Sequence, residues 1–327
     1  MSDTADQIAV ATLARRRAQR LNLLLSLTLL GLLALMWLFL SVETKSFLTR
    51  INILNLARQS SLLAIVAVGQ TFVIITAGID LSVGAVIGFT GVVISLLLAN
   101  DVPLVAALAI TLAAGVLIGS FHALGVTRLG LPPFIMTLAT LTALRGIGLL
   151  ITNGASISVL NDAFTGFSKG SFLVVPNLFW MVILVAIPAY LLLNHTRWGR
   201  YLFAIGSNPE AARLSGVSVP RTIYLAYIIS ATLAAFVGIL VTSRIGIGNA
   251  TTLSGFELQA IAASVIGGTS LFGAVGSITG PLLGSFVLST INNGANLLNV
   301  NAFWQQIITG ALIIVIVYFD QLRRRRR

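Results

Sequence analysis

Long apolar runs, separated by short polar or Gly/Pro-rich breaks, dominate the hydrophobic pattern of this 327-residue chain. An apolar run of about 20 residues is long enough to cross the hydrocarbon core of a bilayer as a helix. An outer-membrane barrel would instead alternate apolar and polar residues along each strand. The pattern therefore predicts an all-α polytopic membrane protein in which some helices are broken or re-entrant.

Ten candidate spans follow from this length criterion and from the positions of the breaks. We expect them at 21–40, 56–77, 80–99, 104–125, 133–152, 176–193, 222–243, 257–272, 276–297 and 303–321. The eighth is short enough to be re-entrant. Residues 21–321 then form one transmembrane domain, with a cytoplasmic tail at 1–20 and a basic cytoplasmic tail at 322–327.

The basic residues gather at the ends of these spans. The chain has 20 Lys and Arg against 9 Asp and Glu, a balance that indicates nucleic acid in a soluble protein. Here the positive-inside rule explains the distribution without nucleic acid. With the N-terminus in the cytoplasm, ten spans return the C-terminus there and place 14 of the 20 Lys and Arg on that side.

The composition offers few groups for chemistry. Only 9% of the residues are charged, compared with about 25% in a typical soluble domain. The chain has no cysteine, and its two histidines, His122 and His195, have no metal-ligand spacing. We therefore predict a protein that is not an enzyme, with no metal site and no cofactor of its own.

A polar segment at 194–221 interrupts the apolar pattern, with four arginines and a single acid, Glu210. Asn208 is expected to cap a short helix, with Pro209 in its first position, Glu210 in its first turn and Gly216 at its end. Such a helix on a cytoplasmic loop is a rigid knob that fits a groove on a partner. A solvated connector is the simpler alternative.

Asp80 lies between two apolar runs in the sequence ITAGIDLSVGA. A carboxylate at a helix centre costs roughly 2.5–3.5 kcal/mol on insertion scales. We expect a broken helix in which Gly78 permits a bend and Asp80 or Ser82 caps the helix containing Gly84. A proton or ion site is the alternative, which is disfavoured because Asp80 falls near the cytoplasmic end of its span.

Asparagines gather at the outer end of the span at 276–297. Their amides are suited to bind sugar hydroxyls, although a polar tip at the membrane interface also explains them. Asn292 and Asn296 lie one helical turn apart. They are the candidate substrate-path residues.

Four segments together resemble a known family. EAARLSG at 210–216 matches the EAA-x-x-x-G core of the loop by which bacterial ABC importer permeases contact their ATPase subunits, although the later I-x-L-P part of that pattern is missing. The other segments are GIDLSVGA at 78–85, ELQAIAASVIGGTSLFGAVGSITGPLLG at 257–284 and NNGANLLNVNAFWQQ at 292–306. With SNPEAARLSGV at 207–217, they closely resemble the ribose-type sugar ABC permeases, from about Ile51 to the C-terminus.

This resemblance implies a permease subunit of an ATP-driven importer for a monosaccharide, ribose-like, in the bacterial inner (plasma) membrane. It implies a second permease copy, an external sugar-binding protein, and a separate ABC ATPase that binds the ATP and Mg. It places Glu210, Ala211, Ala212, Arg213 and Gly216 at the ATPase contact and the segment containing Asp80 near the pathway.

The alternative is a secondary transporter driven by an ion gradient. Such a carrier needs buried carboxylates near the middle of the membrane. Asp80 and Glu257 are the only candidates, and both are expected at helix ends. The sequence leaves open which solute is carried and whether two copies of this chain pair.

Overall fold

The computed structural model describes residues 26–325. The expected tail at 1–20, the first residues of the span at 21–40 and the last two residues of the basic tail lie outside this range. The helices that correspond to the ten expected spans are Ser26–Glu43, α2 (Arg50–Ile75), α3 (Val83–Ala99), α4 (Leu104–Thr127), α5 (Pro133–Thr152), α7 (Asn177–His195), α10 (Val219–Ile245), α11 (Phe256–Ile266), α12 (Thr279–Leu297) and α13 (Ala302–Arg325).

Three shorter helices lie between the long ones: α6 (Asp162–Lys169), α8 (Arg197–Ser207) and α9 (Pro209–Leu214). The strands in the described part are only two residues long. Strand β1 (Ile157–Ser158) pairs with β4 (Ile247–Gly248), and β2 (Ser171–Phe172) pairs with β3 (Val175–Pro176), both antiparallel. The prediction of an all-α polytopic protein is therefore confirmed.

Seven helices in the described range are long and apolar enough to cross a membrane: Ser26–Glu43, α2, α4, α5, α7, α10 and the Phe303–Leu322 part of α13. The other three, α3, α11 and α12, are shorter or more polar, so a count of ten crossings stays a prediction. Helix α11 covers only the first part of the short span expected at 257–272, because it ends at Ile266, where Gly267 and the left-handed Gly268 follow. The re-entrant alternative for this span stays a prediction.

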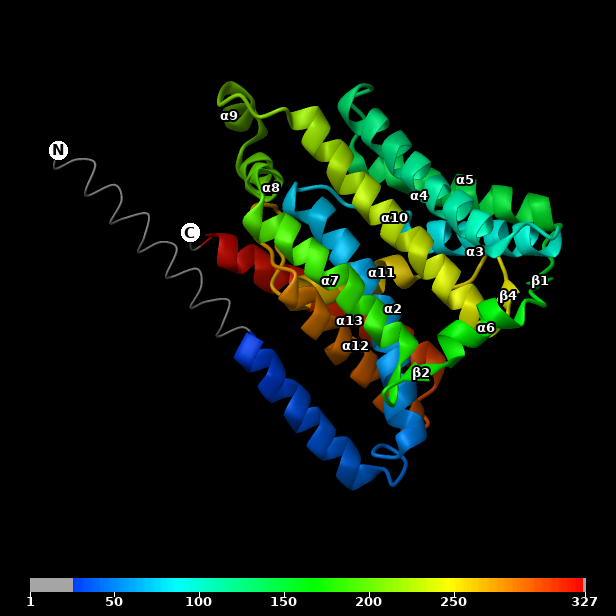
Figure 1. Cartoon of the computed structure of the whole chain (residues 1–327). Helices are drawn as coiled ribbons and strands as arrows, with labels where there is room; N and C mark the ends of the chain where they lie inside the picture. The colour runs from blue at the N-terminus through cyan, green and yellow to red at the C-terminus, as the bar shows by residue number, and fades with distance from the viewer. Residues whose placement is uncertain (1–25, 326–327) are drawn as a thin grey trace.

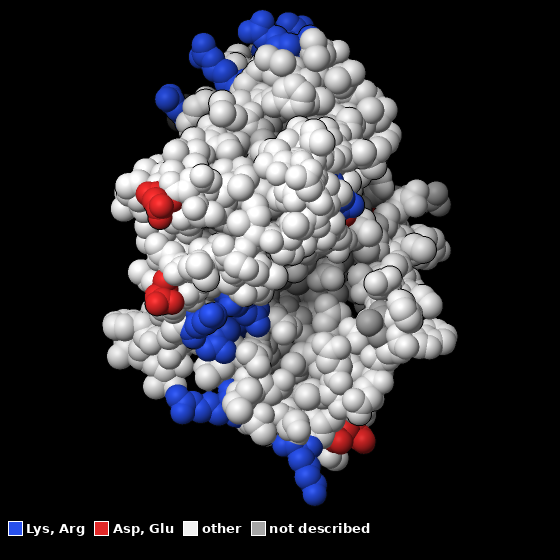
Figure 2. All heavy atoms as spheres, turned by 90° about the vertical axis from the view of Figure 1, so that its right-hand side faces the viewer, with Lys and Arg blue, Asp and Glu red and all other residues white. Residues whose placement is uncertain are grey.

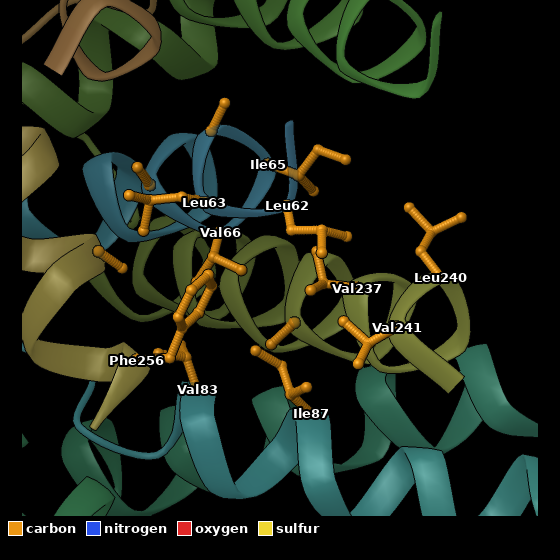
Figure 3. Packing of buried hydrophobic residues seen from close by; sticks show 14 of the residues in the cluster. Leu62, Leu63, Ile65, Val66, Val83, Ile87, Val237, Leu240, Val241 and Phe256 are labelled. Atoms are coloured by element: carbon orange, nitrogen blue, oxygen red, sulfur yellow. The ribbon is translucent and has the colours of Figure 1, made fainter. Parts of the chain in front are cut away.

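Helices α2 and α10 form the centre of the bundle. In their most apolar windows 56% and 67% of the residues are buried, against 22% in both α4 and α7. A helix that is apolar all round belongs in such an interior. Figure 3 shows the core that they share with α3 and α11, in which Val66, Val237, Ile87 and Phe256 point toward one another.

Charged side chains are sparse on the face of the molecule shown in Figure 2. This face is mostly uncharged, with its Lys, Arg, Asp and Glu side chains in a few separate groups. Figure 1 shows helices α8 and α9 at the same end of the bundle as the end of α13, whereas α6 and the strands lie at the opposite end. The polar central segment and the C-terminal helix end therefore share one side.

Candidate functional site

The polar segment at 194–221 folds into α8, α9 and the turn that follows. The Asn208 side-chain oxygen accepts hydrogen bonds from the backbone N–H groups of Glu210 and Ala211, both 3.0 Å long. Pro209 occupies the first position of α9, and Gly216, with a φ of 82°, lies just past the C-cap. The prediction of a short capped helix is therefore confirmed. It could be made from the sequence because the cap, the proline and the glycine lie within a few residues of one another.

One salt bridge is present among residues 26–325, and it lies on α9. Arg213 Nη2 donates to Glu210 Oε1 at 2.6 Å, and Nε donates to Oε2 at 3.1 Å. The hydrogen bonds from Arg213 and the positive charge of its guanidinium hold the pKa of Glu210 below its usual value. Helix α9 thus presents an exposed, internally neutralised pair, while Ala212 faces inward and is buried.

The broken helix expected around Asp80 is present. Helix α2 ends at Ile75, and α3 begins at Val83. The bend, however, uses Ala77, whose φ is 61°, and not Gly78. Gly78 is required for a different reason: a Cβ atom there would approach the Tyr227 hydroxyl oxygen to 2.8 Å. The glycine therefore permits close packing against α10.

Side chains from neighbouring helices satisfy the backbone of this break. Thr137 of α5 accepts a hydrogen bond from the Leu81 N–H and donates one to the Ile79 carbonyl, both at 3.1 Å. Gln70 of α2 donates to the Asp80 carbonyl at 2.9 Å. Non-helical backbone within a membrane protein requires such partners, because lipid supplies none.

The carboxylate of Asp80 is fully buried and joins the break to α10. Its Oδ1 atom accepts hydrogen bonds from the Ser82 backbone N–H at 2.9 Å and the Ser82 hydroxyl at 2.6 Å. Its Oδ2 atom accepts one from the Ser230 hydroxyl at 2.8 Å. Asp80 thus binds a backbone N–H before α3, as expected, but Ser82 makes no side-chain capping bond. Ser230 lies 150 residues away, so no sequence pattern indicated it.

Two further buried polar side chains lie close to this carboxylate. His122 of α4 and Tyr227 of α10 are both within electrostatic range of Asp80. Their rings meet edge to face, with centroids 6.0 Å apart. Neither imidazole nitrogen nor the tyrosine hydroxyl has a hydrogen-bond partner among residues 26–325. Asp80 is therefore the centre of a polar cluster shared by the break, α4 and α10.

Gly84 of the same segment lies at the start of α3 and packs directly against the Glu257 carboxylate. Glu257 occupies the first turn of α11, as expected, and is buried. A carboxylate in a first turn is stabilised by the helix dipole. Asp80 and Glu257, the two buried acids among residues 26–325, thus both lie near the start of α3, where Asp80 bonds Ser82 and Glu257 packs on Gly84.

The two candidate substrate-path residues differ in their surroundings. Asn292 is half-buried, and Asn296 is exposed and accepts a hydrogen bond from Gln305 at 2.8 Å. The neighbouring Asn293 was not singled out, yet it is the buried member of this cluster. It exchanges two amide hydrogen bonds with Asn52 of α2, at 2.7 and 3.1 Å. Asn293 therefore fastens α12 to α2.

Comparisons with known proteins agree on one kind of protein. The family model described as "Branched-chain amino acid transport system / permease component" matches residues 52–317. The ribose import permease protein RbsC of Escherichia coli K12 is 39% identical over 300 residues, which cover 90% of this chain and 94% of that relative.

Two other relatives cover as much of the chain. The probable ABC transporter permease protein y4mJ of Sinorhizobium fredii is 38% identical over 304 residues, covering 92% of this chain and 90% of its own. The xylose transport system permease protein XylH of Escherichia coli K12 is 33% identical, covering 94% of both chains. No solved structure matches the chain.

Proposed function

This chain belongs to the family described as the permease component of branched-chain amino acid transport systems, and we propose that it is the membrane-spanning subunit of an ATP-driven importer for a monosaccharide. The observation that carries this proposal is the similarity to a ribose import permease over 90% of the chain. The family description mentions amino acids, whereas the names of two of the relatives above mention a sugar, ribose in one and xylose in the other. A ribose-like pentose is therefore the proposed solute.

The proposed arrangement follows the positive-inside rule. Ten crossings place both termini and the segment 194–221 in the cytoplasm of a bacterial inner membrane. This agrees with the shared end of α8, α9 and α13 (Figure 1). Residues 21–321 then form one permease domain, and two copies of it assemble around the pathway.

A separate ABC ATPase docks on α9, at Glu210, Ala211, Ala212, Arg213 and Gly216, and binds the ATP and Mg. The exposed knob of α9, with its ends fixed by the Asn208 cap and by Gly216, supports this role. A sugar-binding protein delivers the solute on the opposite side, where Asn292 and Asn296 begin its path. The relatives' names give no support to the alternative of a gradient-driven carrier.

ATP binding drives the cycle through differential affinity. A ligand shifts a conformational equilibrium only as far as it binds one state better than the other. ATP stabilises the closed ATPase pair, the closed pair moves α9, and the permease pair exchanges an outward-facing for an inward-facing pathway. The permease itself performs no covalent chemistry.

Co-purification from the native membrane tests this proposal. The tagged chain should bring down an ATPase subunit in stoichiometric amount, and Glu210→Lys and Gly216→Val variants should lose it. Asp162→Lys, an exposed acid on α6 at the opposite end of the bundle, is the matched control and should retain it. An ATPase that binds all three variants equally would refute the docking site, and no ATPase with the native chain would refute the importer.

A further inference from the structure

Three segments far apart in the sequence meet at the C-terminal end of α2. The Ala274 N–H, in the loop between α11 and α12, donates a hydrogen bond to the Ile75 carbonyl at 2.9 Å. This carbonyl belongs to the last turn of α2, where the helix itself offers no partner. Gly206, in the last turn of α8, lies directly against this pair.

Gly206 leaves no room for a side chain. A Cβ atom there would overlap the Ile75 carbonyl oxygen and would lie 2.6 Å from the Ala274 nitrogen. It would therefore enter the hydrogen bond between α2 and the loop. The loop is equally tight, because a Cβ atom on Gly273 would approach the Ala77 Cβ to 3.0 Å. The backbone of α8 thus rests on the backbone at which α2 breaks.

The rest of α8 strengthens this attachment. Leu202 is buried in the cluster that contains Phe72 and Ile75 of α2, and Ile205 is also buried. The residues that follow Gly206 are exposed, including Asn208 and all but Ala212 in the first turns of α9. Helix α8 is therefore fixed to α2 at its buried face, while α9 projects from its end.

The loop is also attached to the C-terminal helix. Asp320 of α13 accepts hydrogen bonds from the Ser270 hydroxyl at 3.0 Å and the Leu271 N–H at 3.1 Å. A displacement of α8 consequently acts on α2, on this loop and on α13 together. The α2 end leads within five residues to Asp80, which is bonded to α10.

We propose that Gly206 is a positioning residue that transmits movement of α9 to the broken helix. The end of α8, the Ile75–Ala77 turn and the loop at 270–276 move as one rigid body, which displaces the Asp80 segment relative to α10. This inference rests on the proposed function and names the contact through which the ATPase would reach the pathway. It assigns the contact to backbone atoms, so no side-chain replacement at Gly206 preserves it.

The test compares Gly206→Ala with Gly146→Ala in complexes reconstituted with the ATPase in liposomes. Gly146 lies on α5, and a methyl group there meets no atom within 4 Å. Uptake of labelled ribose and xylose should fall about tenfold or more in Gly206→Ala, while ATPase binding and basal ATP hydrolysis stay within about twofold of wild type. Gly146→Ala should match wild type in every assay.

Two results would overturn the inference. One is Gly206→Ala uptake equal to that of Gly146→Ala. The other is measured without any change at Gly206. Spin labels are placed on cysteines introduced at Ser207 and Val275, because the chain has no native cysteine, and the inference predicts the same label-to-label distance with and without ATP. A distance that changes through the cycle would show that the unit is not rigid. Absence of ATP-driven uptake in wild type would refute the proposed function instead.

Discussion

The bond between Ser230 and Asp80 gives the most direct stability prediction, because the chain offers a matched control. Ser230 and Ser285 are both buried serines in helices of the bundle. Ser230 donates to the Asp80 carboxylate 150 residues away, whereas Ser285 donates to the Pro281 carbonyl of its own helix at 2.7 Å. Replacing each by alanine removes the same atom but a different partner.

The expected magnitudes differ several-fold. A hydrogen bond to a charged group contributes about 1.5–3 kcal/mol, and Ser230→Ala leaves Oδ2 of a buried carboxylate without its donor. Ser285→Ala leaves a carbonyl that keeps its helical bond, so about 0.5 kcal/mol is expected. At about 2 °C per kcal/mol for a chain of this size, Tm should fall by about 4 °C for Ser230→Ala and about 1 °C for Ser285→Ala.

Tryptophan fluorescence during heating in one detergent is a suitable assay, since the chain has four tryptophans. The double variant Asp80→Asn/Ser230→Ala should lose less stability than the two single variants together, because the two residues share one interaction. Equal Tm losses for Ser230→Ala and Ser285→Ala, or strictly additive losses in the double variant, would contradict the structural role of the bond.

Three further predictions concern the cap of α9, the ion pair on α9 and the asparagines of α12. Asn208→Ala should cost α9 about 1 kcal/mol and weaken ATPase co-purification, with Asn208→Ser restoring it. The pKa of Glu210 in the folded chain is below the ordinary glutamate value. The ion pair with Arg213 should therefore be complete above the ordinary pKa and be lost only as the pH falls through the lower pKa of the folded chain. Carbon-13 NMR of the three glutamates should show this, and a Glu210 midpoint at the ordinary value would contradict it. Asn293→Ala should lower Tm, whereas Asn292→Ala should raise KM for uptake without a Tm change; the reverse outcome would exchange their roles.

The sequence predicted the parts of the fold that depend on neighbours in the chain. The capped helix α9 followed from Asn208, Pro209 and Gly216, whose interactions all lie within a few residues of one another. The long apolar helices followed in the same way from length and composition. The span at 257–272 was expected to be short, but the end of its helix at Ile266 was not located, because Gly267 packs against Gly280 of α12, a contact that the sequence does not reveal.

The cluster around Asp80 was only half predictable. Asp80 stood out as a carboxylate in an apolar run, but its partners on α4, α5 and α10 depend on how distant helices pack. Gly206 gave no signal, because a glycine in a polar loop has many explanations. The structure shows that this position has no room for a side chain, because a Cβ atom there would overlap the Ile75 carbonyl oxygen.

The Asp80–Ser230 bond also sets an order of events during synthesis. At about 5–20 residues per second, roughly 8–30 s separate the emergence of the two residues, which lie 150 positions apart, from the ribosome. During that interval Ser82 is a hydrogen-bond donor that the nascent chain already supplies to the carboxylate. The Oδ2 atom of Asp80 therefore lacks its Ser230 donor until α10 enters the membrane. The Asp80 carboxylate thus gains its second side-chain donor from a helix that is synthesised well after the break itself.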